Sequence, residues 1–298
     1  MNKINIIFVI GLLIFFGCSE QNIRSDAYGN FESREVIISA EAQGKVLEFN
    51  VEEGREVGPG ELLGYIDTVS LSLTRDQLKS SITAVLSNID NIEAQIVVQQ
   101  QQMDNLVIDR DRIEKLMKDG AATQKQLDDV VGAIRVIERQ IDMLDTQKKM
   151  VMDEAATVRV QIKQVEDNID KCYIVNPERG TVLTKYVEAN EIATPGRSLY
   201  KIADLSRLEL KVYISGVQLP YVKIGQQVEV LVDKDDKSNR ALPGVVSWIS
   251  QQAEFTPKIV QTKEERVSLV YAMKVVVEND GSLKIGMPGE VNFMEKSE

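Results

Sequence analysis

The sequence predicts an elongated α+β protein, in which a long antiparallel coiled-coil hairpin interrupts a small β domain and a β-barrel follows. Three observations lead to this fold class. A β pattern occurs twice at a constant offset of 136 residues. A seven-residue hydrophobic period fills the segment between the two copies, and apolar and polar residues alternate again in the last third of the chain.

The chain begins with MNKINIIFVIGLLIFFGCSE, which is typical of a secretory signal, because one lysine precedes a largely apolar run that ends at Gly17. A helix over this run would be about 21 Å long, whereas the hydrocarbon core of a bilayer is roughly 30 Å thick. A stable transmembrane span is therefore the weaker interpretation, and we expect a signal peptide at 1–17.

The residue after this run is Cys18, and the small Gly17 before it resembles the cleavage site of bacterial lipoproteins. We therefore expect lipidation of Cys18. Phe15 and Phe16 depart from the small residues usual at such a site, which leaves an uncleaved anchor as the alternative. In either case the rest of the chain is exported and held at a membrane, and residues 18–34 are expected to form a polar tether.

The repeated β pattern pairs VEEGREVGPGELLGYID at 51–67 with VEANEIATPGRSLYKIA at 187–203, and the two copies align without a gap. Both alternate apolar and polar residues in short runs broken by turn residues, as half-buried strands do. The proposed turn residues are Gly44, Gly54, Gly60, Gly180, Asn190 and Gly196. Gly and Asn both tolerate a positive φ, so Asn190 can replace Gly54. We therefore expect two halves of one β domain, at 35–67 and 172–203.

The segment between the halves, 68–171, has no proline and only two glycines, which is a helical composition. Its apolar residues follow spacings of four and three from Leu78 to Met117 and again from Leu127 to Ile169. This period is typical of a coiled coil. The two series mirror each other about residue 122, so we expect two antiparallel helices of roughly 50 residues, about 75 Å long.

The predicted reversal of the hairpin contains Gly120, which suits the left-handed position after a helix, and a T-x-x-Q capping box made by Thr123 and Gln126. Three polar residues, Gln99, Arg110 and Lys148, interrupt the apolar series. They are expected to reach the rim by their aliphatic stems. A contact with a neighbouring copy of the hairpin is the alternative.

The last part of the chain, 204–298, is predicted to form a second β domain. Strand-like alternation occurs in LELKVYIS, QQVEVLV, LPGVVSWIS, VSLVYAMKVVVE and GEVNFM. This pattern indicates a barrel of about six strands from Leu205 to Met294.

Composition restricts the chemistry that the chain can perform. The net charge is −11, and no basic stripe offers a site for nucleic acid. The chain has no histidine and two cysteines, which excludes Cys/His zinc or haem sites and an imidazole base. We expect no catalytic residues, no metal and no cofactor, and Cys172 is expected to be a small buried residue near a helix end.

The two β halves resemble a split lipoyl or biotinyl carrier domain with the hairpin inserted where the modified lysine would stand. The junction here reads Ile66-Asp67-Thr68, so no prosthetic group can attach. A split lipoyl-like domain with a helical hairpin and a following barrel is similar to the periplasmic adaptor subunits of bacterial efflux and secretion pumps, the haemolysin-secretion-D-like membrane fusion proteins. The resemblance extends from about Glu32 to the end of the chain.

In that family the hairpin tip carries Arg, Leu and Ser at fixed spacing, and RIEKLMKDGAAT places Arg112, Leu116 and Thr123 on those positions, with Thr in place of Ser. The resemblance implies that this tip docks on a TolC-like outer-membrane channel. The alternative is that Leu116 and Thr123 only end and cap helices, although Arg112 has no capping role.

The resemblance further implies an inner-membrane transporter as partner, a periplasmic location in a Gram-negative-type envelope, and a ring of six copies. VKIGQQVEV resembles the barrel signature of the family, and AEFTPKIVQTKEERV resembles a segment of adaptors that serve ABC-type exporters, with the RND type as the alternative. A membrane-proximal domain after the barrel is expected to be reduced or absent. A carrier-domain enzyme subunit would need the missing lysine, and the alternative function is that of a lipid-anchored structural coiled coil without a transport role. The exported molecule is not indicated.

Overall fold

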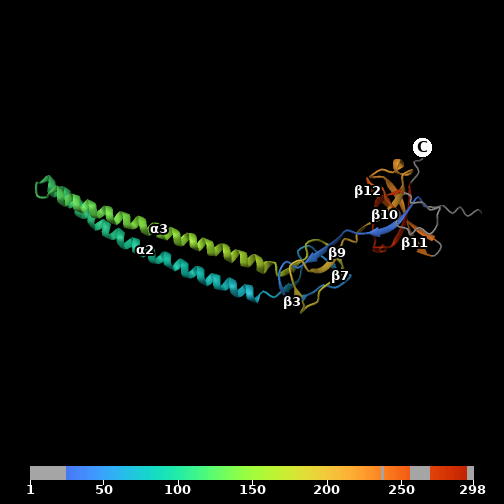
Figure 1. Cartoon of the computed structure of the whole chain (residues 1–298), viewed down its shortest axis with the longest axis horizontal. Coiled ribbons are helices and arrows are strands. Elements are labelled where there is room, and N and C mark those ends of the chain that lie inside the picture. Colours follow the sequence, from blue (N-terminus) through green and yellow to red (C-terminus); the bar gives the residue numbers. More distant parts are fainter. Residues whose placement is uncertain (1–24, 236–237, 256–268, 294–298) are drawn as a thin grey trace, which may run out of the picture. The chain divides into compact units, whose positions relative to one another are not determined.

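The computed structural model describes residues 25–235, 238–255 and 269–293, which form two compact units. One unit comprises residues 37–202, and the other comprises the described residues before 37 and after 202. Figure 1 shows the helical hairpin in the first unit and separate β structure in each. The α+β class, with a helical hairpin between β halves and a following barrel, is therefore confirmed.

The β part of the first unit consists of two four-stranded sheets, each of which takes two strands from each repeat copy. The strands of the first copy are β2 (Glu35–Ser39), β3 (Gly44–Phe49), β4 (Glu56–Val57) and β5 (Leu62–Ile66). Those of the second copy are β6 (Tyr173–Val175), β7 (Gly180–Lys185), β8 (Ile192–Ala193) and β9 (Ser198–Ala203). The sheets have the orders β2-β9-β7-β4 and β6-β5-β3-β8. Neither copy forms a sheet alone, so the two halves make one domain.

The core of this domain is built from the identities of the repeat. Four aligned pairs are at most 2% exposed: Val46 and Val182, Val51 and Val187, Leu63 and Leu199, and Ile66 and Ile202. Leu47 is the exception, because it is 40% exposed. The repeat therefore records the residues that the two halves must bury together.

The turns follow the same pattern. Gly54 and Asn190 have φ values of +86° and +76°, and Gly60 and Gly196 have +77° and +85°. Asn190 has the only positive φ outside glycine among the described residues, in line with the tolerance of Asn for this region. Gly44 and Gly180 lie at the starts of β3 and β7, where Gly44 pairs with Ala193 and Gly180 with Val57.

The hairpin consists of α2 (Val69–Lys118) and α3 (Gln124–Asp170). Its buried residues are Ile92, Ile134, Leu144, Ala155 and Ile169, all of which belong to the two predicted apolar series. Ion pairs between the helices, Lys148 Nζ to Glu93 Oε1 at 2.6 Å and Lys79 Nζ to Glu166 Oε1 at 3.3 Å, join residues at similar distances along the chain from the turn. The mirrored register is thereby confirmed.

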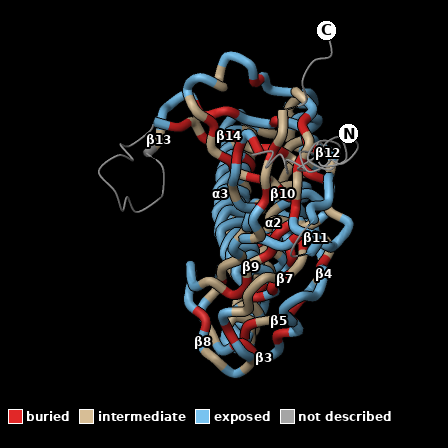
Figure 2. Tube along the Cα trace, turned by 90° about the vertical axis from the view of Figure 1, so that its right-hand side faces the viewer, coloured by how far each residue is buried: buried red, intermediate tan, exposed pale blue. Residues whose placement is uncertain are grey.

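Because the seam between the two helices is narrow, most of the surface of each helix is exposed and polar. Figure 2 shows exposed residues over most of both helices, whereas buried residues concentrate in the strands. Lys148 reaches the rim, as its ion pair with Glu93 shows. Within the described part of the chain, neither helix is apolar enough over a sufficient length to cross a membrane.

The second unit is a β-barrel of six antiparallel strands. Its strands are β1 (Ala27–Glu32), β10 (Arg207–Ser215), β11 (Gln227–Asp235), β12 (Ser238–Ile249), β14 (Leu269–Glu278) and β15 (Pro288–Phe293), with β13 (Glu254–Phe255) as a short addition to β14. The order is β10-β1-β15-β11-β12-β14, and pairing of β10 with β14 closes the barrel. The core includes Phe31, Leu208, Leu210, Val230, Met273, Val275 and Val291.

Strand β1 corrects the prediction that 18–34 is only a tether. Ala27 and Phe31 are 1% and 0% exposed, and β1 pairs with both β10 and β15. The barrel therefore has six strands, but one of them comes from before the split domain. The polar character of the neighbouring residues concealed β1, and its partners β10 and β15 lie about 185 and about 260 residues further along the chain, where a local pattern gives no information.

Candidate docking surface at the hairpin tip

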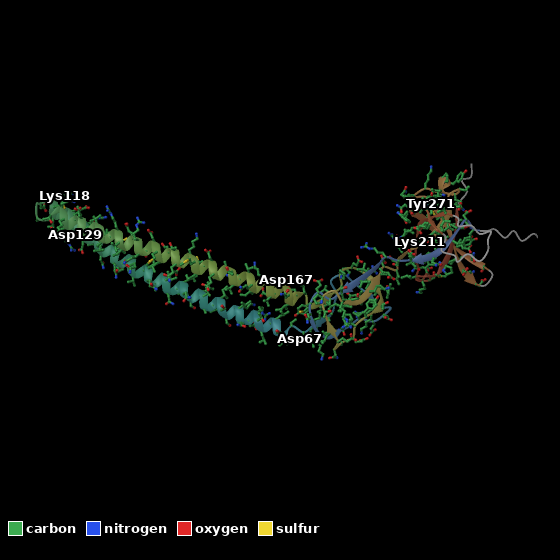
Figure 3. The ribbon with its side chains drawn as sticks, in the orientation of Figure 1. Asp67, Lys118, Asp129, Asp167, Lys211 and Tyr271 are labelled. Atoms are coloured by element: carbon green, nitrogen blue, oxygen red, sulfur yellow. The ribbon has the colours of Figure 1, made fainter. Side chains whose placement is uncertain are left out.

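The tip of the hairpin is closed by a hydrogen-bonded reversal. Gly120 has φ +71° and donates its N–H to the Met117 carbonyl at 3.0 Å, while Ala121 donates to the Leu116 carbonyl at 2.8 Å. These two bonds make a Schellman motif, which satisfies carbonyls that a helix end would otherwise leave unpaired. Figure 3 marks the tip by Lys118 on α2 and Asp129 on α3. The backbone of the tip is thus fixed by its own contacts.

Thr123 is the N-cap of α3 and takes part in the predicted capping box. Its N–H donates to Gln126 Oε1 at 2.8 Å, and the Gln126 N–H donates to Thr123 Oγ1 at 3.4 Å. The hydroxyl also lies 3.0 Å from Gln126 Oε1, to which it can donate. The hydroxyl of Thr123 therefore has a structural role, although the residue itself is exposed.

Leu116 is one of the exposed apolar side chains of the hairpin, at 41%. It lies in the last turn of α2, and its carbonyl oxygen is the acceptor in the reversal. The basic side chains of Lys115 and Lys118 lie in the same turn, where they interact favourably with the C-terminal end of the helix dipole. The exposed Leu116 side chain thus lies next to the tip, in the same helical turn as the two lysines.

Arg112 lies one helical turn before Leu116, on the same face of α2. Its Nη1 donates to Asp109 Oδ1 at 2.8 Å, and its side chain remains 67% exposed. An exposed pair of this kind contributes about 0.5 kcal/mol to helix stability. The guanidinium can therefore exchange Asp109 for a partner at small cost, and sequence reasoning had not identified this intrahelical pair.

The junction where the hairpin enters the β domain has a purely structural arrangement. Asp67 donates its N–H to the Lys45 carbonyl at 2.8 Å, and its Oδ1 accepts from the Val69 N–H at 2.9 Å. The carboxylate of Asp67 thus satisfies an amide at the start of α2, which Thr68 does not cap with its side chain. Asp67 thus belongs to the start of the helix in its hydrogen bonding.

Cys172 lies directly after α3, and its Sγ is 3.3 Å from the Asn168 carbonyl. The residue is fully buried, and this burial raises the pKa of the thiol. A thiol in this state is a poor nucleophile. Across the ranges 25–235, 238–255 and 269–293 there is no cluster of three or more His, Cys, Asp or Glu residues suited to a metal ion.

The core of the β domain contains a polar contact that the sequence did not indicate. Tyr200 and Asn176 are both fully buried, and the Tyr200 hydroxyl donates to Asn176 Oδ1 at 3.0 Å. The Asn176 Nδ2 donates to the Gly58 carbonyl at 2.9 Å and also to that of Glu178. Burial raises the pKa of Tyr200 well above its ordinary value, so the phenol stays neutral. Tyr200 and Asn176 belong to the second repeat copy and Gly58 to the first, so the bond from Asn176 to Gly58 joins the two copies.

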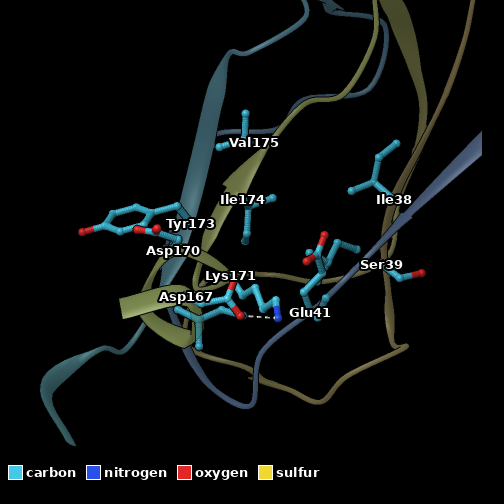
Figure 4. Close-up of a pocket in the computed structure, with 12 residues that line it drawn as sticks. Ile38, Ser39, Glu41, Asp167, Asp170, Lys171, Tyr173, Ile174 and Val175 are labelled. Atoms are coloured by element: carbon cyan, nitrogen blue, oxygen red, sulfur yellow. Dashed lines mark hydrogen bonds and ion pairs between the residues drawn. The ribbon is translucent and has the colours of Figure 1, made fainter. Parts of the chain in front are cut away.

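A cavity of about 330 Å³ lies where α3 meets the β domain. Figure 4 shows Glu41, Asp167 and Asp170 at its polar side and Ile38 and Ile174 at its apolar side. Lys171 Nζ donates to Asp167 Oδ2 at 2.6 Å, and this hydrogen bond raises the pKa of Lys171. The charged side chains that line the cavity are thus partly paired with each other. The lining contains no cysteine and no histidine, and its one serine, Ser39, has no histidine base beside it.

Three predictions lie outside the described residues: the signal peptide at 1–17, the lipidation of Cys18, and most of the segment AEFTPKIVQTKEERV. The structure supplies no contacts for them.

No family model matches the chain. A curated relative from Yersinia enterocolitica, named UPF0194 membrane protein, is 25% identical over 99% of this chain and 100% of its own length. A protein of the same name from Enterobacter sp. strain 638 is 25% identical, covering 92% of this chain and 90% of its own.

Two solved structures share the fold. MacA from Actinobacillus actinomycetemcomitans is 22% identical with a TM-score of 0.59, and the match covers 89% of this chain and 76% of MacA. The membrane fusion protein Spr0693 from Streptococcus pneumoniae R6 is 15% identical with a TM-score of 0.57, covering 89% of this chain and 96% of its own. The chain thus shares the fold of MacA and of a membrane fusion protein, and the predicted resemblance is confirmed for the fold.

Proposed function

We propose that the chain is a periplasmic adaptor that connects an inner-membrane exporter to a TolC-like outer-membrane channel and takes part in efflux or secretion without altering the substrate. The observation that carries this proposal is the hairpin tip. Its reversal is held by internal hydrogen bonds, while Leu116 and Arg112 remain exposed beside it. A rigid tip with an exposed apolar and an exposed cationic side chain is suited to insertion into a partner's groove.

The length of the hairpin fits this role. Helices of 50 and 47 residues are about 75 and 70 Å long, so one hairpin can bridge a large part of the space between two membranes. Because only a narrow apolar seam has to be buried between the two helices, two helices alone are enough to reach this length. Such a length has no evident use in a catalytic domain, because the tip is remote from every buried polar group of the β domain.

The exporter is proposed to be of the ABC type, with the RND type as the alternative. The preference rests on the sequence AEFTPKIVQTKEERV alone. The two types use different energy sources. Export that stops on depletion of ATP but persists after collapse of the proton gradient identifies the ABC type, and the reverse result identifies the RND type.

Several copies, six in the proposed ring, would pack side by side to enclose a conduit. The flank of the hairpin supports such packing, because Val98, Val136 and Met143 are more than half exposed there. Between the helices, the groove that Val98 and Met143 line also contains Gln99, whose Oε1 is buried without a hydrogen-bond partner in the described part of the chain. A neighbouring copy could supply that hydrogen bond. The assembly would be checked by its mass in detergent.

The membrane attachment is proposed to be a lipid on Cys18, which places the chain in the periplasm and anchors it to the inner membrane. The names of the curated relatives, UPF0194 membrane protein, support membrane association. Metabolic labelling with palmitate should mark the chain, and Cys18→Ser should abolish the label. A wild-type chain that carries no label but still fractionates with membranes would show that the uncleaved apolar segment is the anchor, and a labelled Cys18→Ser chain would show acylation at another residue.

The experiment that tests the function is genetic. The gene is deleted, and the sensitivity of the strain to toxic compounds and its export profile are recorded. The strain is then complemented with the wild-type chain, with Leu116→Ser or with Val97→Ser. Val97 is 62% exposed on the same helix, so its substitution is a matched control. We expect the wild type and Val97→Ser to restore export and Leu116→Ser to reduce it about tenfold at equal protein abundance.

The alternative function is that of a lipid-anchored structural coiled coil. It accounts for the signal and the hairpin but not for the β domain whose two halves the hairpin separates. An unchanged export profile after deletion, combined with a defect in envelope integrity, would favour this alternative over the adaptor.

A further inference from the structure

Among the described residues of the barrel, the loop between β10 and β11, residues 216–226, carries the most exposed large apolar side chains. Val217 is 80% exposed, Tyr221 is 78% exposed and Ile224 is 63% exposed. Within the same loop, Leu219 packs against the barrel core and Val222 is 5% exposed. The loop thus has two apolar residues directed to the core and three presented to the outside.

This exposure occurs on an ordered loop. A short 3-10 helix spans Leu219–Tyr221, and Gly225 donates its N–H to the Val246 carbonyl at 2.8 Å. The Gln218 side chain accepts from the Ser215 N–H at 2.9 Å and donates to the Asp26 carbonyl at 2.8 Å. The three outward side chains are therefore held in place, although their exposure to water has a free-energy cost.

The loop lies at one end of the barrel, together with the start of β14. Ser215 pairs with Val270, so Leu269, which is 56% exposed, lies next to the loop. We name Val217, Tyr221, Ile224 and Leu269 the barrel-end surface. The other end of the barrel differs, because ion pairs gather there: Arg207 with Glu278 at 2.8 Å and Arg240 with Asp280 at 2.7 Å.

The chain enters the barrel at this same end. The Asp26 carbonyl accepts the hydrogen bond from Gln218, and β1 begins at the next residue. Cys18 precedes Asp26 by eight residues, which span at most about 28 Å when fully extended. Whether the anchor is a lipid on Cys18 or the apolar run before it, the tether holds this barrel end within about 30 Å of the membrane.

We propose that the barrel-end surface rests on the phospholipid bilayer, with Val217, Tyr221 and Ile224 at the level of the headgroups. This inference rests on the membrane attachment in the proposed function. Tyrosine favours the interface between headgroups and water, and Lys223, the single charged residue of the loop, can extend its ammonium to lipid phosphates. The contact orients the barrel on the membrane, which attachment at one point alone cannot do.

The proposal is tested with the full-length chain reconstituted into vesicles of phosphatidylethanolamine and phosphatidylglycerol. A single environment-sensitive fluorophore is attached at Val217→Cys or Tyr221→Cys in a Cys172→Ala background. The matched control is Ile285→Cys, because Ile285 is a 39% exposed apolar residue at the other end of the barrel. A chain without an introduced cysteine shows any label on Cys18, and thermal unfolding verifies that each variant folds.

Nitroxide groups on the lipid headgroups should quench the label at 217 and 221 by about twofold or more and leave the label at 285 unquenched. Equal quenching at 217 and 285, or none at 217, would overturn the proposal. It is also overturned if the label at 217 responds only when an exporter is reconstituted with the chain, because the surface would then bind protein. Complementation of export by these variants is scored separately, so a failed lipid contact leaves the adaptor function standing.

Discussion

The side chains of Arg112 and Leu116 contribute little to the local structure of the hairpin tip. Leu116 contributes its carbonyl to the reversal, which any residue would supply, and Arg112 makes only an exposed pair with Asp109. Thr123, in contrast, has a local role that explains its residue type. The three positions at the tip are therefore not equivalent, and substitutions separate recognition from capping.

Arg112→Ala should reduce export about tenfold, whereas stability should change by less than about 0.5 kcal/mol, since only an exposed pair is lost. Arg139 is the matched control, because it makes the same type of pair with Asp142, at 2.7 Å, on the other helix. Export assays and thermal unfolding are run on both variants. If Arg112→Ala and Arg139→Ala behave alike, Arg112 is a solvated helix residue and not a docking residue.

Thr123→Ala should weaken the start of α3 by about 1 kcal/mol, since the Gln126 N–H loses its side-chain acceptor and keeps only the Thr123 carbonyl, and Thr123→Ser should retain the cap. Hydrogen exchange of the amides at 124–127 measures this, with roughly fivefold faster exchange expected for Thr123→Ala alone. Unchanged exchange would mean that the hydroxyl is free for another purpose.

At the scale of the elements, the hairpin and the barrel depend on different kinds of contact. The hairpin is held by a narrow apolar seam, in which Ile92 is 3% exposed on α2, and by pairs such as Lys148 with Glu93 at its rim. The barrel depends on one short strand from a distant part of the chain. β1 fits between β10 and β15 because Gly29 allows β10 to approach closely.

Ile92→Ala should destabilise the hairpin by about 2 to 4 kcal/mol, because a buried methylene set is lost from the seam. Val97→Ala removes methyl groups that are already in water and should cost less than about 0.5 kcal/mol. Helix content followed during thermal unfolding compares the two. Similar values would contradict the seam as the source of hairpin stability.

Gly29→Ala should disrupt the barrel, because an added Cβ would lie 1.7 Å from the Lys211 carbonyl oxygen. Backbone must move to relieve this contact, at an expected cost of about 3 kcal/mol or more. Gly58→Ala is the control, since no heavy atom lies within 4 Å of its added Cβ and its φ is not positive. Exchange of the β1 and β10 amides reports the effect, and protection equal to the wild type would refute it.

At the scale of the whole molecule, the parts with a period were predictable and the parts without one were not. The repeat at a fixed offset identified the split domain, because the same inward positions are buried in both copies. The heptad period identified the hairpin and its register. β1, with two buried apolar residues in six, had no such signal, and neither had the hydrogen bond from Gln218 to Asp26 that joins positions 192 residues apart.

The candidate site was predictable in part. Gly120, Thr123 and Gln126 have local rules that a sequence displays, so the tip geometry followed from them. The pairing of Arg112 with Asp109 depends on which of several neighbouring carboxylates the guanidinium selects. The exposed loop at 216–226 escaped prediction because the inward and outward residues of an irregular loop follow no period.

The most direct measurement of the central claim is photocrosslinking in living cells from position 116. Leu116 is replaced by a photoreactive residue, with Val160, which is 66% exposed on α3, as the control position, and the adducts are identified by mass spectrometry. We predict an adduct between position 116 and an outer-membrane channel protein, absent at position 160. Adducts from 116 that contain only further copies of this chain or inner-membrane proteins would contradict the adaptor account.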